Sequence, residues 1–163
     1  MASLISLLTG ILGIVTADPP SPAAIAACSA IAKGTAETQL YPGDALNADY
    51  VTAKDHYWSA ANADPTPACV VFPTNANEVS AVVKVLQSYT DVNFAMKSGG
   101  HNPNVGWSST DGGVLISFSK LANTTYNAET QTADIGPGSR WSEAISALEP
   151  YNVAVVGGRI GQY

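Results

Sequence analysis

The most regular hydrophobic pattern of the chain runs from residue 69 to residue 96. Cys69–Phe72 is a short apolar run that ends at Pro73, which predicts a short buried strand. Asn75 and Glu78 resemble a capping box, and a helix is indicated by apolar residues at i, i+3, i+4 and i+7, namely Val79, Val82, Val83 and Leu86. A second strand is predicted by the alternation of Val92, Phe94 and Met96. A strand, a helix and a strand in so few residues favour a βαβ unit with a parallel pair.

The pattern after residue 110 predicts more strands and one more helix. Val114–Phe118 is predicted as a strand, and we expect Thr132–Ile135 to lie beside it. After a turn at Gly136–Gly138, we expect Ser139 to cap a short helix that carries on one face Trp141, Ile145 and Leu148. A last apolar run, Val153–Val156, leads into a pair of glycines.

The first 17 residues have the pattern of a leader. They carry no charge, and their apolar run Leu4–Val15 is shorter than the roughly 20 residues that a membrane-spanning helix needs. Small residues at 15–17, followed by Asp18-Pro19-Pro20, predict a signal peptide over residues 1–17. The alternative is a buried N-terminal helix. We therefore expect a secreted protein that does not contact the membrane after the signal is removed.

Residues 18–67 are expected to form an N-terminal extended segment with one short helix. The helix is predicted over the Ala-rich stretch Ala23–Ala32, ending near Gly34. Thr35–Pro67 is rich in Asn, Asp, Pro and Gly and shows little periodicity, so we expect an extended surface segment. Four aromatic residues are expected to hold this segment down: Tyr41, Tyr50, Tyr57 and Trp58.

Composition narrows the class of protein. The chain has 163 residues, of which 46% are hydrophobic and 12% charged, as in folded globular proteins with a core. The net charge is −6 and the basic residues are scattered, which argues against nucleic acid as a partner. Any phosphate must therefore be held locally, by backbone N–H groups and one or two cations.

Cys28 and Cys69 are the two cysteines of the chain. In an oxidising compartment they can form a disulfide, which would stabilise the fold by roughly 4 kcal/mol; two unpaired buried thiols are the alternative. Their spacing fits neither a zinc site nor a CxxC redox motif, and no metal site is predicted. Asn123-Thr124-Thr125 is a glycosylation sequon in a polar, turn-rich stretch.

The candidate functional residues lie in the segment Lys97–Ser108, directly after the second predicted strand. The glycines of Ser98-Gly99-Gly100 allow positive φ, so successive N–H groups can converge on an anion, and Lys97 can add a local positive charge. His101 can then serve as a nucleophile, a base or an attachment point. His56 is interpreted as structural. The sequence contains no GxGxxG, GxSxG or HExxH motif, which argues against a Rossmann site, the common hydrolases and zinc proteases.

Lys97-Ser98-Gly99-Gly100-His101 resembles the (R/K)SGGH motif of the berberine-bridge-enzyme-like FAD-linked oxidoreductases, which share their FAD-binding domain with the vanillyl-alcohol oxidase group. The resemblance covers about residues 25–160. Further similar segments are Cys69–Pro73 with the helix after it, Gly113–Ser117, the G-x-G-x-x-W-like turn Ile135–Trp141, and Val156–Arg159. The pair Cys28 and Cys69 also fits the N-terminal disulfide of the family.

The resemblance implies an α+β fold. We expect the N-terminal lobe of a PCMH-type FAD-binding domain, with a small mixed sheet flanked by helices, and residues 68–163 forming a partial FAD-binding domain. Members of the family normally run to several hundred residues, so this domain is expected to be incomplete at the C-terminus.

The resemblance also implies roles for individual residues. His101 would be bonded through a ring nitrogen to the 8α carbon of the isoalloxazine. The pyrophosphate would contact Ser98, Gly99, Gly100 and Asn102, with Lys97 in the place of the usual arginine. The wall around the flavin would be continued by Gly106 and Ser108 and, from the other side, by Gly157 and Gly158. The family reaction is oxidation of a small organic substrate by hydride transfer to the flavin, with dioxygen as the acceptor.

The sequence names no catalytic base, substrate or oligomeric state. Two functions other than an FAD-dependent oxidoreductase remain open: a non-catalytic secreted remnant, and a small secreted protein whose glycine loop binds another anionic ligand. A covalently bound flavin would distinguish the FAD-dependent oxidoreductase from these two alternatives.

Overall fold

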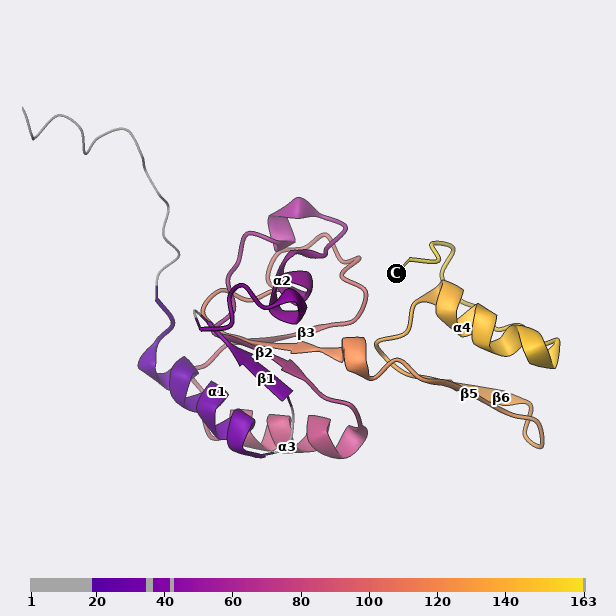
Figure 1. Ribbon diagram of the computed structural model, residues 1–163, viewed down its shortest axis with the longest axis horizontal. Coiled ribbons are helices and arrows are strands. Elements are labelled where there is room, and N and C mark those ends of the chain that lie inside the picture. The colour runs from indigo at the N-terminus through magenta and orange to yellow at the C-terminus, as the bar shows by residue number, and fades with distance from the viewer. Residues whose placement is uncertain (1–18, 35–36, 42, 163) are drawn as a thin grey trace, which may run out of the picture.

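The computed structural model describes residues 19–34, 37–41 and 43–162. The predicted signal peptide, residues 1–17, lies outside the described residues. A layered body of helices and sheet holds most of the chain, and a smaller unit of a hairpin and one helix lies beside it (Figure 1). Within the described ranges, every helix is too short or too polar to traverse a lipid bilayer.

The central sheet contains four strands in the order β1-β2-β4-β3: β1 (Glu37–Leu40), β2 (Cys69–Phe72), β4 (Val114–Ser117) and β3 (Phe94–Lys97). β1 is antiparallel to β2, whereas β2, β4 and β3 are parallel. The predicted βαβ unit has the expected parallel orientation, but β4 lies between its two strands. All four residues of β4 are buried, which is typical of a central strand covered on both faces.

Helices cover both faces of this sheet. α1 (Pro22–Gly34) and α3 (Ala76–Leu86) pack on one face, and α2 (Ala48–Asp55) packs on the other (Figure 1). The core of the α1 and α3 side includes Ala27, Ile31, Val71, Val82, Leu86, Val114 and Ile116. The core of the α2 side includes Tyr50, Ala53, Val70, Phe72, Ala95 and Leu115. The small mixed sheet flanked by helices is confirmed.

Two local predictions on the α1 and α3 side are also confirmed. Cys28 of α1 and Cys69 of β2 form a disulfide with a Cα–Cα distance of 6.0 Å, which joins the first helix to the sheet. Asn75 caps α3, because its Oδ1 accepts a hydrogen bond from Glu78 N at 3.0 Å. The Glu78 carboxylate accepts a hydrogen bond from Thr74 N at 2.7 Å, one residue before the capping residue.

The segment predicted to be extended, residues 35–67, is more structured than its sequence suggests. Besides β1 it contains α2 and the short 3-10 helix η1 (Ala60–Asn62). Two buried side chains, Tyr50 and Ala53, anchor α2, which is too few for a visible helical period. The Tyr50 hydroxyl donates to Pro67 O at 2.8 Å, as expected of an anchoring aromatic, but Trp58 is 59% exposed.

The prediction that residues 132–135 pair with β4 is wrong. β6 (Thr132–Ile135) pairs in antiparallel register with β5 (Thr124–Asn127) in a separate two-stranded sheet. Both edges of β4 are already occupied, by β2 and by β3, so no edge is available to β6. The β5 sequence is mostly polar, and for that reason the hairpin is not visible as a hydrophobic pattern.

The start of the last helix also differs from the prediction. α4 (Trp141–Leu148) is preceded by Arg140 as its N-cap residue, and Arg140 N donates to the Glu143 carboxylate at 2.9 Å. Ser139 does not cap the helix, because its hydroxyl donates to Ala122 O at 2.7 Å. Of the three apolar residues expected on one face, Leu148 is buried, Trp141 is half-buried and Ile145 is exposed. The run from 153 to 156 forms no strand; a third 3-10 helix, η3 (Glu149–Tyr151), precedes it.

Candidate functional site

The glycine and histidine loop, residues 98–108, leaves the sheet at the carboxyl end of β3. Because β2, β4 and β3 are parallel, the last residues of all three strands lie at this same edge. β4 continues here into the 3-10 helix η2 (Phe118–Lys120), which leads toward the hairpin and α4 (Figure 1). The crevice outside the carboxyl ends of parallel strands is the usual place for ligands in α/β sheets.

Gly100 is required by the geometry of this loop. Its φ is +75°, a conformation that favours glycine. A Cβ atom there would lie 3.0 Å from His56 O, from Lys97 Cε and from Tyr57 Cδ1. Gly106 also has a positive φ of +85°, but it faces open space. The loop backbone therefore packs tightly on its support at Gly100 and is loose at Gly106.

Residues 53–62, which we call the cradle segment, hold this loop through hydrogen bonds to its backbone carbonyl groups. Trp58 N donates to Gly100 O at 3.0 Å. The Tyr57 hydroxyl donates to Ser108 O at 2.6 Å, and burial raises the pKa of Tyr57 above its ordinary value, so this phenol stays a donor. The start and the end of the loop are thus fixed by adjacent residues of one segment.

Asn62 completes the cradle segment. Its side chain is fully buried, its Nδ2 donates to Asn102 O at 3.0 Å, and its Oδ1 accepts from Ser109 Oγ at 2.9 Å. Ser109 Oγ in turn accepts from Gly106 N at 3.1 Å. One buried amide therefore connects both halves of the loop, although Asn62 lies about forty residues before the loop in the sequence.

His101 lies at the exposed surface of the loop. Its ring lies over the cradle segment, with the centroid 5.6 Å from that of Trp58 and the ring planes inclined by 56°. An exposed imidazole on a loop that is fixed on both sides can act as an attachment point or as a base.

Lys97 lies beneath the loop and does not extend from it. The residue is 3% exposed, its ammonium donates to Ala53 O at 2.5 Å, and the same atom is 3.6 Å from the centroid of the Tyr57 ring. Burial and, to a smaller extent, the positive charge of Arg140 together lower the pKa of Lys97 to about 7. The expected local positive charge on the loop is instead a buried contact between β3, α2 and the cradle segment.

Ser98 ties the loop to the hairpin unit. Its hydroxyl donates to Pro137 O at 2.5 Å, in the turn between β6 and α4. Gly136 and Gly138 in that turn have no room for a Cβ, which would overlap the carbonyls of Leu121 and Phe118. The G-x-G spacing therefore serves close packing of the turn on the segment around η2.

Gly157 and Gly158 lie flat against the indole of Trp141. A Cβ atom on either residue would overlap that ring. The segment that follows is held to α4, because Ser142 N and Ser142 Oγ both donate to Gly161 O, at 3.0 and 2.8 Å. These glycines thus have a packing role within the hairpin unit, and their opposite face is exposed.

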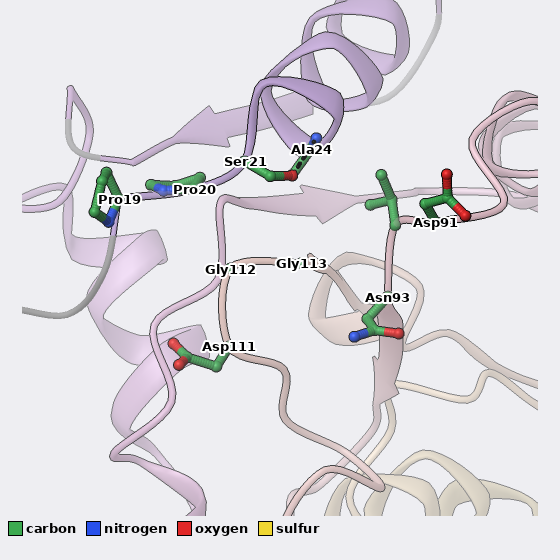
Figure 2. A pocket seen from close by; sticks show the side chains of 10 residues that line it. Pro19, Pro20, Ser21, Ala24, Asp91, Asn93, Asp111, Gly112 and Gly113 are labelled. Carbon is green, nitrogen blue, oxygen red and sulfur yellow. Dashed lines mark hydrogen bonds between the residues drawn. The ribbon is translucent and has the colours of Figure 1, made fainter.

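A pocket of about 220 Å³ opens at the other end of the sheet, away from the glycine loop (Figure 2). Its polar side chains include Asp91, Asn93 and Asp111, and Gly112 and Gly113 form part of its wall. Asp111 Oδ1 accepts from Thr66 N at 3.0 Å, so this carboxylate already fixes a loop. The residues of the glycine and histidine loop do not line this pocket.

The sequence profile of a known family, the FAD binding domain, matches residues 67–158. The chain belongs to this FAD-binding family. An uncharacterised FAD-linked oxidoreductase of Arthroderma benhamiae is 46% identical over 113 residues, which are 69% of this chain and 23% of that protein. An FAD-dependent monooxygenase of Penicillium terrestre, macF, is 34% identical over 184 aligned positions, covering 98% of this chain and 35% of that protein.

Solved structures share the fold of this chain. Chitooligosaccharide oxidase superposes with a TM-score of 0.67 at 21% identity, over 84% of this chain and 28% of that chain. The Physcomitrella patens protein BBE-like 1 superposes with a TM-score of 0.64 at 24% identity, over 77% of this chain and 26% of that chain. The chain thus spans about a quarter to a third of the length of the proteins that it matches.

The donor set around the loop fits the diphosphate of FAD, the cofactor of this family. In the part of the chain that the structure describes, neither the N–H of Gly99 nor that of Gly100 donates a hydrogen bond. Two buried side-chain atoms, Ser108 Oγ and Arg140 Nη1, have no partner among the described residues. Backbone N–H groups, a hydroxyl and a guanidinium are the groups that hold phosphate oxygens in proteins.

The FAD-binding family resemblance did not identify every residue that shapes the site. Sequence reasoning missed Asn62 and Arg140 and gave Tyr57 and Trp58 only an anchoring role. Asn62 and the loop that it supports are 40 residues apart, and no periodicity links them. Arg140 was visible only as one residue inside the G-x-G-x-x-W-like turn.

Proposed function

We propose that this chain supplies the histidine-loop part of the cofactor site of a secreted FAD-dependent oxidoreductase. FAD is attached covalently to His101, and the enzyme oxidises a small organic substrate with dioxygen as acceptor. The observation that carries the proposal is the loop itself: His101 is exposed at the carboxyl edge of the parallel strands, on a backbone fixed by the cradle segment. The names of the relatives, FAD-linked oxidoreductase and FAD-dependent monooxygenase, support an oxidation chemistry.

Different residues of the chain hold different parts of the cofactor. The backbone of Gly99 and Gly100 binds the diphosphate, with Ser98, Asn102, Gly106 and Ser108 lining the approach. Gly157 and Gly158 close the site from the hairpin unit. Trp58 packs on the imidazole of His101 and limits its rotation. When bound, the flavin supplies hydride acceptance and reoxidation by dioxygen.

Covalent attachment uses His101 as the nucleophile. A ring nitrogen of His101 would hold the flavin through its 8α carbon. Forming that bond would release two electrons and two protons, which dioxygen would take up as hydrogen peroxide. The bond retains the cofactor and withdraws electron density from the flavin, which raises its potential.

Secretion is part of the proposal. The disulfide between Cys28 and Cys69 is stable in an oxidising compartment, and Asn123 is exposed at the start of β5, where a glycan would meet no obstruction from the core. Both features are consistent with passage through the secretory pathway.

The test is the intact mass of the natural protein, followed by peptide mapping. We expect a flavin adduct on the peptide that contains His101, an intact disulfide, and an N-terminus produced by removal of residues 1–17. His101→Ala should abolish the adduct and leave the disulfide in place, whereas the control Lys84→Ala, on the exposed side of α3, should keep the adduct. A flavin still attached in His101→Ala, or no flavin in the natural protein, would overturn the proposal.

A further inference from the structure

A second hollow lies beside the glycine loop at the carboxyl edge of the sheet. We call it the cation pocket; its volume is about 290 Å³. The last residues of the three parallel strands, Phe72, Lys97 and Ser117, form its floor. The remaining walls come from α2, from η2, from the first loop residue and from the start of α4, and include Asp49, Thr52, His56, Ser98, Lys120 and Arg140.

The cation pocket has an excess of positive charge. Of its three basic side chains, Lys120 is paired twice, with Asp49 at 2.9 Å and with Glu37 at 2.8 Å. Lys97 is bound to Ala53 O and lies over an aromatic ring. Asp49, the single carboxylate lining the pocket, is therefore already engaged, and it faces a lysine.

Arg140 differs from the two lysines. In the described residues its Nη1 is buried and has no hydrogen-bond partner. Its backbone is fixed, because Arg140 N donates to the Glu143 carboxylate at 2.9 Å. A buried donor without an acceptor destabilises the folded protein unless a ligand supplies the acceptor. The buried guanidinium therefore points to an anionic ligand.

We propose that Arg140 binds a phosphate of the FAD diphosphate. The phosphate lies on the side of the cation pocket that is formed by Ser98, the first residue of the glycine loop. The inference rests on the proposed function. Ser98 lines the pocket and begins the loop whose Gly99 and Gly100 N–H groups donate no hydrogen bond among the described residues. A planar guanidinium matches two phosphate oxygens at once, which an ammonium does not. Arg140 thus provides the counter-charge that the sequence suggested for Lys97.

The experiment compares two ligands that differ in the diphosphate. The full chain carrying His101→Ala, which keeps binding reversible, is titrated calorimetrically with FAD and with riboflavin. Adding Arg140→Gln should weaken FAD binding by about tenfold to a hundredfold, the loss expected for charge-assisted hydrogen bonds, and leave riboflavin binding unchanged. Adding Arg140→Lys should restore part of the loss, because the charge returns without the fork geometry.

The control is Lys84→Gln, which removes one positive charge from the exposed side of α3 and should change neither affinity. Circular dichroism and an intact Cys28–Cys69 disulfide verify that each variant is folded. Equal FAD affinity with and without Arg140→Gln, or an equal loss of FAD and riboflavin affinity, would overturn this inference alone. A folded His101→Ala chain that binds neither ligand would overturn the proposed function, and this inference with it.

Discussion

At the scale of one residue, Lys97 shows how burial changes what a charged side chain can do. Its ammonium is enclosed by β3, the end of α2 and the Tyr57 ring, so it supports the loop and does not face a ligand from the loop surface. The identity of the residue was visible in the sequence, but its direction was not. Direction depends on α2 packing over the sheet, and α2 itself left no hydrophobic period.

The buried ammonium predicts a pH dependence of stability. Burial lowers the pKa of Lys97 from 10.5 to about 7 in the folded chain. Above pH 7 the unfolded chain therefore binds a proton that the folded chain lacks, so the free energy of unfolding should rise with pH through this window. Below pH 7 both states are protonated and the burial penalty is fully present. Urea unfolding at several values from about pH 6 to 9 measures the slope.

Lys97→Met should flatten this slope, because no proton is then released on folding. Lys84→Met, an exposed lysine on α3, should leave the slope of the parent chain unchanged. Parallel slopes for the parent chain and Lys97→Met would show that Lys97 keeps its proton when folded.

At the scale of elements, the cradle segment is the structure that determines where His101 lies. It reaches the loop by Trp58 N, the Tyr57 hydroxyl and the Asn62 amide, each on a different part of the loop. The cradle segment contacts the loop through these single hydrogen bonds and through the close packing of Gly100 on His56 and Tyr57. Its function is therefore one of orientation, and its effect should be seen in flavin attachment more than in stability.

Asn62→Ala tests this orientation. The change leaves Asn102 O and Ser109 Oγ without their buried partner, a loss of about 1–3 kcal/mol in unfolding free energy. Because the loop is then held at fewer points, we expect a slower rate of covalent flavin attachment to His101 with no change in the final attachment site. Flavin fluorescence in denaturing gels, followed over time after FAD addition, measures this rate.

Asn104→Ala is the matched control, since it removes the same amide from an exposed position of the same loop. It should attach flavin at the parental rate. If Asn62→Ala loses stability as expected but attaches flavin at an unchanged rate, Asn62 has a structural role only.

The elements that could be predicted from sequence are those with strong local signals. β2, α3 and the loop after β3 can be predicted because an apolar run, a helical period and a glycine pair follow one another between residues 69 and 100. The hairpin partner of β6 could not be predicted, because β5 is polar and strand pairing depends on which edges remain open. The β3 alternation predicted a strand correctly, yet its apolar Phe94 and Met96 are about half exposed, since β3 lies at the edge of the sheet beyond the helices.

At the scale of the whole molecule, the chain divides into two units of unequal burial. The layered body has fully buried central strands, and the disulfide ties its first helix to β2. In the hairpin unit, β5 and β6 alternate between half-buried and exposed residues, and α4 contributes two buried side chains. A two-stranded sheet has little stability of its own. Contacts such as the hydrogen bond from Ser98 to Pro137 connect the two units.

This division predicts two levels of hydrogen exchange. Amides of β2 and β4 should open only with global unfolding, whereas amides of β5 and β6 should exchange at a lower free energy, because the hairpin can separate from the body without exposing its core. Native-state exchange followed by mass spectrometry resolves the two sets of peptides. Equal protection of both sheets would show that the chain opens as one unit.

Since the proposed FAD site joins the loop after β3 to Arg140 before α4, FAD binding should slow exchange in the hairpin unit more than in the body. That outcome would make the cofactor a structural link between the two units.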